Sequence, residues 1–123
     1  MKNILFSVVA ILSLANLVYS QANGEWKTVY TFSGNSSENT DDFTIKSNKF
    51  CIIWVASKQY EEVYGGNFIV HLVDSDGKED LIINVIPEDS GKTIIRKKGT
   101  FYFKVTSALT KWNIEVQQYR SKK

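Results

Sequence analysis

The sequence contains a single cysteine, Cys51, and a single histidine, His71. One cysteine cannot form a disulfide within the chain, so the fold must be stabilised by burial of apolar side chains instead of covalent cross-links. One histidine excludes zinc sites that are built from several His or Cys ligands. We interpret Cys51 as a buried thiol that behaves as a small hydrophobe, with an intermolecular disulfide as the alternative.

The sequence also lacks a dominant charge, because its 15 basic side chains are nearly balanced by 13 acidic ones. Nucleic-acid-binding domains usually carry a basic excess, so we expect no nucleic acid partner. Beyond the first 22 residues, no apolar run approaches the roughly 20 residues that a helix needs to cross a bilayer. We therefore expect no membrane association after the leader is removed.

Residues 1–22 have the composition of a secretory signal peptide. Lys2 supplies a positive charge, residues 4–18 are mainly apolar, and Ser20 and Ala22 are small side chains suited to cleavage. We expect cleavage after Ala22, with a cut after Ser20 as the alternative. The expected product is a secreted or extracellular protein, or a periplasmic one in a Gram-negative bacterium, with residues 23–123 as one domain.

Apolar and polar side chains alternate with a period of two along most of residues 23–123, which is typical of half-buried β-strands. Residues 50–57 are apolar on both parities and predict a central strand covered on both faces. A turn is predicted at 87–91. The predicted fold is all-β, an antiparallel, jelly-roll-like β-sandwich of about eight short strands. The predicted strands cover 26–32, 43–45, 50–57, 68–73, 81–86, 93–96, 100–106 and 112–119.

The segment from Thr40 to Val116 resembles bacterial secreted accessory domains. It contains Thr40-Asp-Asp-Phe-Thr-Ile, an apolar strand with Trp54, Phe68-Ile-Val-His-Leu-Val-Asp-Ser-Asp-Gly, Gly99-Thr-Phe-Tyr-Phe-Lys-Val and Trp112-Asn-Ile-Glu-Val. This series is similar to the pre-peptidase C-terminal type of β-sandwich and, more loosely, to carbohydrate-binding jelly rolls. The resemblance implies a non-catalytic module of secreted proteins.

Three carboxylates, Asp74, Asp76 and Asp80, alternate in the manner of a calcium-binding loop. An EF-hand loop that began at Asp74 would have Lys78 at its fifth position and Val85 at its twelfth, where oxygen ligands are needed. A hairpin turn accounts for the Asp-Gly step in this segment without any metal. We therefore expect no metal and no cofactor, with these three carboxylates as the calcium alternative.

The single histidine does not indicate a catalytic site. His71 lies between Val70 and Leu72 in a predicted strand, and no serine motif accompanies it. A general base needs a nucleophile and an orienting acid within reach, so we expect a strand histidine that faces solvent or a polar partner. We expect that the protein is not an enzyme.

Exposed aromatic side chains are the candidates for ligand binding. The longest predicted loop between apolar strands carries two tyrosines with two glutamates between them, and strand parity turns one further tyrosine outward. Rigid rings beside acidic groups suit contact with a sugar face or a protein. The alternative is that the tyrosines cover the sandwich edge. The candidate ligand-binding residues are Tyr60, Glu61, Glu62, Tyr64 and Tyr102.

These features favour a secreted, non-catalytic binding module for carbohydrate or another extracellular ligand. The alternative is a secreted protein-interaction or assembly component that acts through a sheet edge or face. The expected partner is an extracellular glycan or protein. Asn35 begins the motif Asn-Ser-Ser and is a glycosylation site if the source is a eukaryote.

Overall fold

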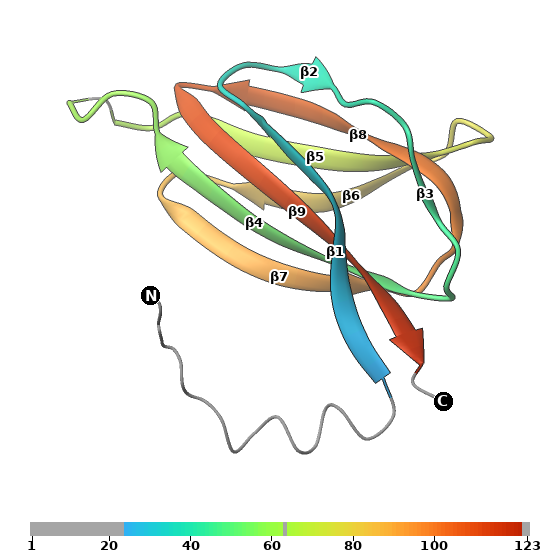
Figure 1. The fold of residues 1–123 in the computed structure, drawn as a ribbon. Helices are drawn as coiled ribbons and strands as arrows, with labels where there is room; N and C mark the ends of the chain where they lie inside the picture. The colour runs from blue at the N-terminus through green and yellow to red at the C-terminus, as the bar shows by residue number, and fades with distance from the viewer. Residues whose placement is uncertain (1–23, 63, 122–123) are drawn as a thin grey trace, which may run out of the picture.

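The computed structural model describes residues 24–62 and 64–121. Every regular secondary-structure element in these ranges is a β-strand, and the strands form two antiparallel sheets packed face to face (Figure 1). The all-β prediction is therefore confirmed. The predicted signal peptide, residues 1–22, lies outside the described residues. Within the described ranges, no helix is long and apolar enough to cross a lipid bilayer.

Each sheet combines strands that are distant in sequence. Sheet A has the order β1 (Gly24–Gly34), β9 (Thr110–Ser121), β4 (Phe50–Lys58) and β7 (Asp89–Ile95). Sheet B has the order β2 (Glu38–Asn39), β8 (Gly99–Ala108), β5 (Asn67–Asp74) and β6 (Glu79–Val85), and β3 (Phe43–Ile45) also pairs with β8.

The pairing follows a simple rule, in which early strands join late ones. β1 pairs with β9, β2 and β3 pair with β8, β4 pairs with β7, and β5 pairs with β6. The chain is therefore arranged as one long hairpin folded over into two layers. As a result, Gly24 pairs with Ser121, and the two ends of the described chain lie side by side (Figure 1).

Side chains alternate between the core and the outer face of each sheet, as strand geometry requires. On β9, Asn113 is exposed between two buried residues, and on β8 Lys104 and Thr106 are exposed in the same way. The two inner faces together form one hydrophobic core. The core residues on these two strands are Phe101, Phe103, Val105, Trp112, Ile114 and Val116.

Phe43 is the centre of an aromatic cluster inside this core. The strand that carries it, β3, has three residues, but its ring touches partners from both sheets. The nearest partner is Phe103, with ring centroids 4.8 Å apart. Other rings within about 6 Å, the range of favourable aromatic pairs, belong to Tyr30, Phe32, Phe50 and Phe101.

Several strand predictions need correction. The polar segment predicted as a loop contains β2, which pairs with β8 through Glu38 and Asn39. The turn predicted at 87–91 is wrong at its end, because β7 begins at Asp89. Gly91 is a strand residue in contact with Trp54: a Cβ built on it would lie 2.6 Å from Cζ2 of that indole ring. The glycine therefore leaves room for the Trp54 ring and is not a turn residue.

The predicted central position of residues 50–57 is confirmed, because β4 lies between β9 and β7. The prediction that both of its faces are covered is wrong, since Val55 is exposed on the outer face. A two-layer fold covers only one face of each sheet. Cys51 is buried even on this outer parity, where it lies between Ile94 and Gln117 of the neighbouring strands.

One residue, Leu109, connects β8 in sheet B with β9 in sheet A. Its φ of 56° lies in the left-handed region that side chains other than glycine rarely adopt. The next residue, Thr110, is fully buried, and its Oγ1 lies 2.8 Å from the Ala108 carbonyl oxygen and 3.1 Å from the Asn67 carbonyl oxygen. This hydroxyl therefore fixes the corner between the two sheets to the start of β5.

Candidate functional site

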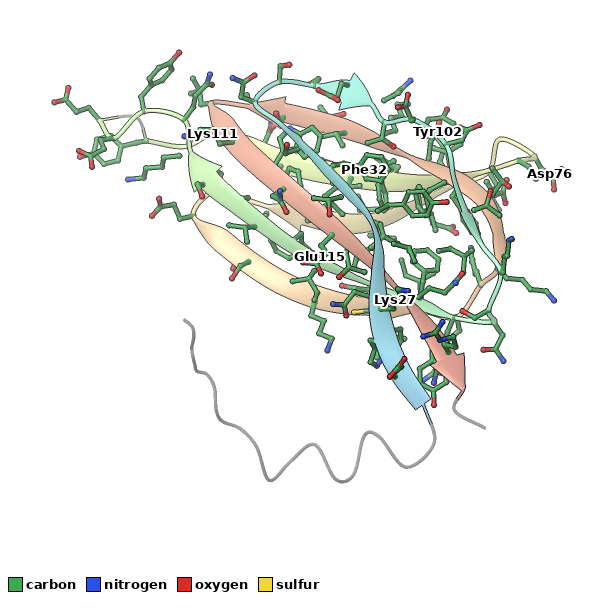
Figure 2. The ribbon with its side chains drawn as sticks, in the orientation of Figure 1. Lys27, Phe32, Asp76, Tyr102, Lys111 and Glu115 are labelled. Atoms are coloured by element: carbon green, nitrogen blue, oxygen red, sulfur yellow. The ribbon has the colours of Figure 1, made fainter. Side chains whose placement is uncertain are left out.

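The fold separates the predicted ligand-binding residues into two groups. Tyr60, Glu61, Glu62 and Tyr64 lie on the loop between β4 and β5. Tyr102 lies on β8 opposite Val73, near the far end of β5. Figure 2 shows Tyr102 and Asp76 toward one end of the molecule and Lys111 at the other. The five residues therefore cannot form one site.

The turn between β5 and β6 is organised by the carboxylate of Asp74. Its Oδ1 accepts hydrogen bonds from the backbone N–H groups of Asp76 (2.9 Å) and Lys78 (3.0 Å). Gly77 donates its N–H to the Asp74 carbonyl oxygen and has a φ of 85°, a conformation that favours glycine. The Asp-Gly step is thus a tight turn, as the sequence predicted.

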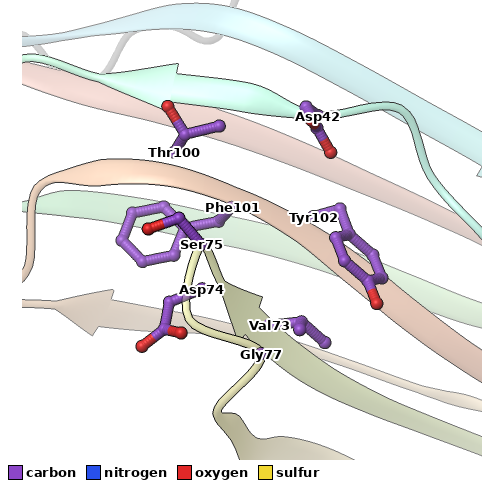
Figure 3. A pocket seen from close by; sticks show the side chains of 8 residues that line it. All are labelled: Asp42, Val73, Asp74, Ser75, Gly77, Thr100, Phe101 and Tyr102. Atoms are coloured by element: carbon purple, nitrogen blue, oxygen red, sulfur yellow. The ribbon is translucent and has the colours of Figure 1, made fainter.

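An open hollow of about 380 Å³ lies beside this turn. Its polar groups come from three separate segments, namely the residue before β3, the β5–β6 turn and β8 (Figure 3). The Tyr102 side chain is half-buried, whereas Asp42 and Thr100 are exposed. The lining residues are Asp42, Val73, Asp74, Ser75, Gly77, Thr100, Phe101 and Tyr102.

The register of β8 brings these segments together. Phe43 pairs with Phe101, so Asp42 comes next to Tyr102 on one side, while Val73 pairs with Tyr102 on the other. The hollow is lined by two carboxylates, three hydroxyl groups and two aromatic rings, of which Phe101 is buried and Tyr102 half-buried. Such groups bind the hydroxyls and the C–H face of a small polar ligand, and the volume falls within the range of about 300–1,000 Å³ of ligand pockets.

A second hollow, of about 370 Å³, continues past Ser75 and Thr100 to the side where the lysines lie. Lys97 donates a hydrogen bond to the Asp80 carboxylate, which keeps the pKa of that carboxyl below its ordinary value. Lys98 lines the same hollow. Among the described residues, the first hollow is therefore lined by carboxylates without a basic side chain, whereas the second is lined by both lysines and aspartates.

The three carboxylates of the calcium alternative are not gathered around one point. Asp74 accepts backbone hydrogen bonds, Asp80 pairs with Lys97, and Asp76 is exposed at the tip of the turn. Across the described residues, no group of three or more His, Cys, Asp or Glu side chains is placed to hold a metal ion.

His71 lies on the outer face of sheet B, where its neighbours across the strands are Leu81 and Lys104. Its Nδ1 atom is buried and has no hydrogen-bond partner among the described residues. Leu81 is apolar and the Lys104 ammonium pairs with the Glu79 carboxylate, so neither neighbour forms a nucleophile–base dyad with His71.

Cys51 and Asn35 occupy contrasting environments. Burial raises the pKa of the Cys51 thiol above its ordinary value, while the nearby Lys92 lowers this pKa and Glu115 raises it, both to a smaller extent. Asn35 is exposed between β1 and β2, in a segment anchored by the Trp112 indole, which donates to the Ser36 carbonyl oxygen at 3.1 Å. The sequon asparagine is therefore on the surface.

The sequence analysis did not single out three residues of the first hollow, Asp42, Ser75 and Thr100. No local pattern marks them, because they meet only through the pairing of β3 and β5 with β8. The one available signal was the outward parity of Tyr102. No protein-family model matches this sequence, and no curated protein is significantly similar to it.

Proposed function

We propose that this is an exported, non-catalytic binding module that takes a carbohydrate in the hollow beside Tyr102. The observation that carries the proposal is that Asp42, Asp74, Ser75 and Thr100 line one hollow together with the half-buried ring of Tyr102. Carboxylates form strong, charge-assisted hydrogen bonds with sugar hydroxyls. An aromatic ring offers an apolar face for the C–H groups of the sugar.

The strand order supports a jelly-roll-like fold for this module. Two four-stranded sheets in which the first strand pairs with the last, and each inner strand with its counterpart, match the double-sheet arrangement of jelly rolls if β2 and β3 count as one interrupted strand. Lectin domains are among the proteins with this architecture. That parallel, like the resemblance to secreted accessory domains, is an analogy of fold and adds to the site chemistry without replacing it.

The glycan proposal is tested on a glycan array with three proteins of matched thermal stability. We expect the wild type to bind at least one glycan, and Asp42→Ala and Tyr102→Leu each to weaken that binding about tenfold or more. Tyr60→Ala, at the opposite end of the molecule, is the control and should bind like the wild type. Absence of any bound glycan, or full binding by Asp42→Ala, would contradict the proposal.

Export is tested independently of binding. The full-length gene is expressed in a host with a secretory pathway, and the protein in the medium or periplasm is sequenced from its N-terminus. We expect the mature chain to begin at Asn23, because small residues precede this position. A chain that stays in the cytosol with Met1 and Lys2 in place would contradict export.

An assembly role through a sheet edge is the second candidate, favoured by β6. This strand is the edge of sheet B, has β5 as its one partner within the described part of the chain, and exposes the apolar side chain of Leu81. Edge strands present unpaired N–H and C=O groups to which another chain can add. Light scattering that shows a dimer in the wild type and a monomer in Leu81→Lys would support this role. A wild type that is monomeric at every concentration would contradict it.

A further inference from the structure

Exposed apolar side chains gather at the end of the sandwich opposite the hollow. Among the residues that the structure describes, eight large hydrophobic side chains are exposed, and four of them lie on the three connections at this end: β4–β5, β6–β7 and β8–β9. We call these four residues the loop platform. They are Tyr60 (58 % exposed), Tyr64 (87 %), Ile86 (65 %) and Leu109 (41 %).

The three connections are packed against one another at Gly66. A Cβ atom at this position would lie 2.6 Å from the Ala108 carbonyl oxygen, 3.3 Å from Leu109 Cβ and 3.4 Å from Pro87 Cγ. The Gln59 N–H also donates to the Leu109 carbonyl oxygen at 3.1 Å. The platform side chains are therefore carried on segments that fix one another's positions, which lowers the entropy lost on binding.

Leu109 is the least expected member of the platform. Its left-handed backbone would suit glycine, yet the position holds a large side chain that is partly exposed and is absent from the hydrophobic core. Backbone strain of this kind often accompanies functional positions, where it is offset by the surrounding structure. The leucine therefore lies outside the hydrophobic core, where it packs beside Gly66 and keeps 41 % of its surface exposed for contact with a partner.

The rim of the platform is acidic. Glu61, Glu62, Glu88 and Asp89 are all exposed, and among the described residues none of them takes part in an ion pair. Two lysines lie at the same end, Lys58 and Lys111. The Nζ atom of Lys58 is 5.3 Å from the centroid of the Tyr64 ring, so a platform ring already accepts a cation.

We propose that the loop platform binds a segment of a partner polypeptide whose apolar side chains are flanked by lysine or arginine. The aliphatic groups of Ile86 and Leu109 suit leucine-like or aromatic anchors, and the acidic rim complements basic neighbours. The same rim repels phosphate-bearing surfaces such as anionic lipid or nucleic acid. This binding does not depend on the carbohydrate hollow, which lies at the other end of the molecule.

The probe is a displayed library of random peptides about twelve residues long, a length suited to a groove or loop surface. The full chain, exported by its host cell, is the bait. We expect the enriched peptides to combine net positive charge with leucine, isoleucine or aromatic residues, and their binding to weaken as salt rises. Failure to enrich any peptide, or enrichment of acidic peptides, would overturn the proposal.

Platform variants then locate the binding site. Ile86→Ser and the double charge reversal Glu61→Lys with Glu62→Lys should each weaken the enriched peptides about tenfold or more. Leu109→Gly should weaken them as well, and because glycine suits the left-handed backbone at this position, we expect its thermal unfolding temperature to stay close to that of the wild type. Ile94→Ser is the matched control for Ile86→Ser, because Ile94 is an exposed isoleucine on β7, outside the platform, and its substitution should leave binding unchanged. Equal binding by the platform variants and the wild type would overturn the proposal.

Discussion

At the scale of single residues, Thr110 shows how one hydroxyl group holds a corner of the fold. It is fully buried, and its two acceptors, the Asn67 and Ala108 carbonyl oxygens, lie on different strands of sheet B. We predict that Thr110→Val lowers the free energy of unfolding by about 1–3 kcal/mol, because buried acceptors lose their donor. Urea-induced unfolding measures this change. Thr110→Ser keeps the hydroxyl and should lose less, and a valine variant as stable as the wild type would contradict the assignment.

Cys51 gives a second prediction at this scale. Because burial raises the pKa of its thiol, the folded chain disfavours the thiolate. The associated stabilisation is complete below the unfolded thiol pKa of about 8.5 and is lost as pH rises through the higher folded value. We therefore predict slow labelling of the native protein by a thiol-reactive dye at neutral pH. Labelling should become fast in urea, and equal rates in both conditions would show that the thiol is accessible.

At the scale of elements, the β5–β6 hairpin depends on the Asp74 carboxylate. This group accepts two backbone N–H groups of the turn, at 2.9 and 3.0 Å. We predict that Asp74→Ala destabilises the protein by about 1–2 kcal/mol, while Asp74→Asn, whose amide oxygen can accept the same bonds, loses less. Thermal unfolding followed by circular dichroism measures both. Identical losses in the two variants would mean that charge, not turn geometry, is important at this position.

The strands themselves were largely predictable, since their alternation is a local property of the sequence. The burial of Trp112, Ile114 and Val116 on one side of β9 was evident from parity alone. Strand β2 was missed because its Glu38 and Asn39 side chains are polar and exposed, and only backbone pairing defines it. The start of β7 was missed because a glycine was interpreted as a turn residue, whereas it contacts a tryptophan.

At the scale of the whole molecule, the aromatic cluster joins the two sheets. Phe43 contacts rings on β1 and β4 of sheet A and on β8 of sheet B. We predict that Phe43→Ala lowers the free energy of unfolding by about 3–5 kcal/mol, a large part of the roughly 5–15 kcal/mol that is typical of a whole domain. Phe43→Leu fills more of the space and should cost less. Urea unfolding distinguishes the two, and an alanine variant close to wild-type stability would show that the cluster is not central.

The order of the strands in each sheet and the location of the candidate sites could not be predicted from the sequence. The hollow depends on Asp42 and Val73 meeting Tyr102, and the loop platform on Gly66 meeting Pro87 and Leu109. These contacts join segments far apart in sequence, and residue periodicity reports only which face of a strand is apolar, not which strand lies beside it. The tyrosines were identified as exposed, but their separation to opposite ends was not.

The antiparallel pairing of the first and last strands has a mechanical consequence. Gly24 and Ser121 lie side by side, so a pulling force on the two ends would act across the β1–β9 ladder and break its hydrogen bonds one pair at a time. Force transmitted instead from the C-terminus to a molecule held by Tyr60 and Tyr64 would act between the C-terminal ends of β9 and β4. These ends lie at opposite ends of the β4–β9 ladder, so its hydrogen bonds would be loaded together. The same domain should therefore open readily when stretched by its ends and resist when stretched through its ligand.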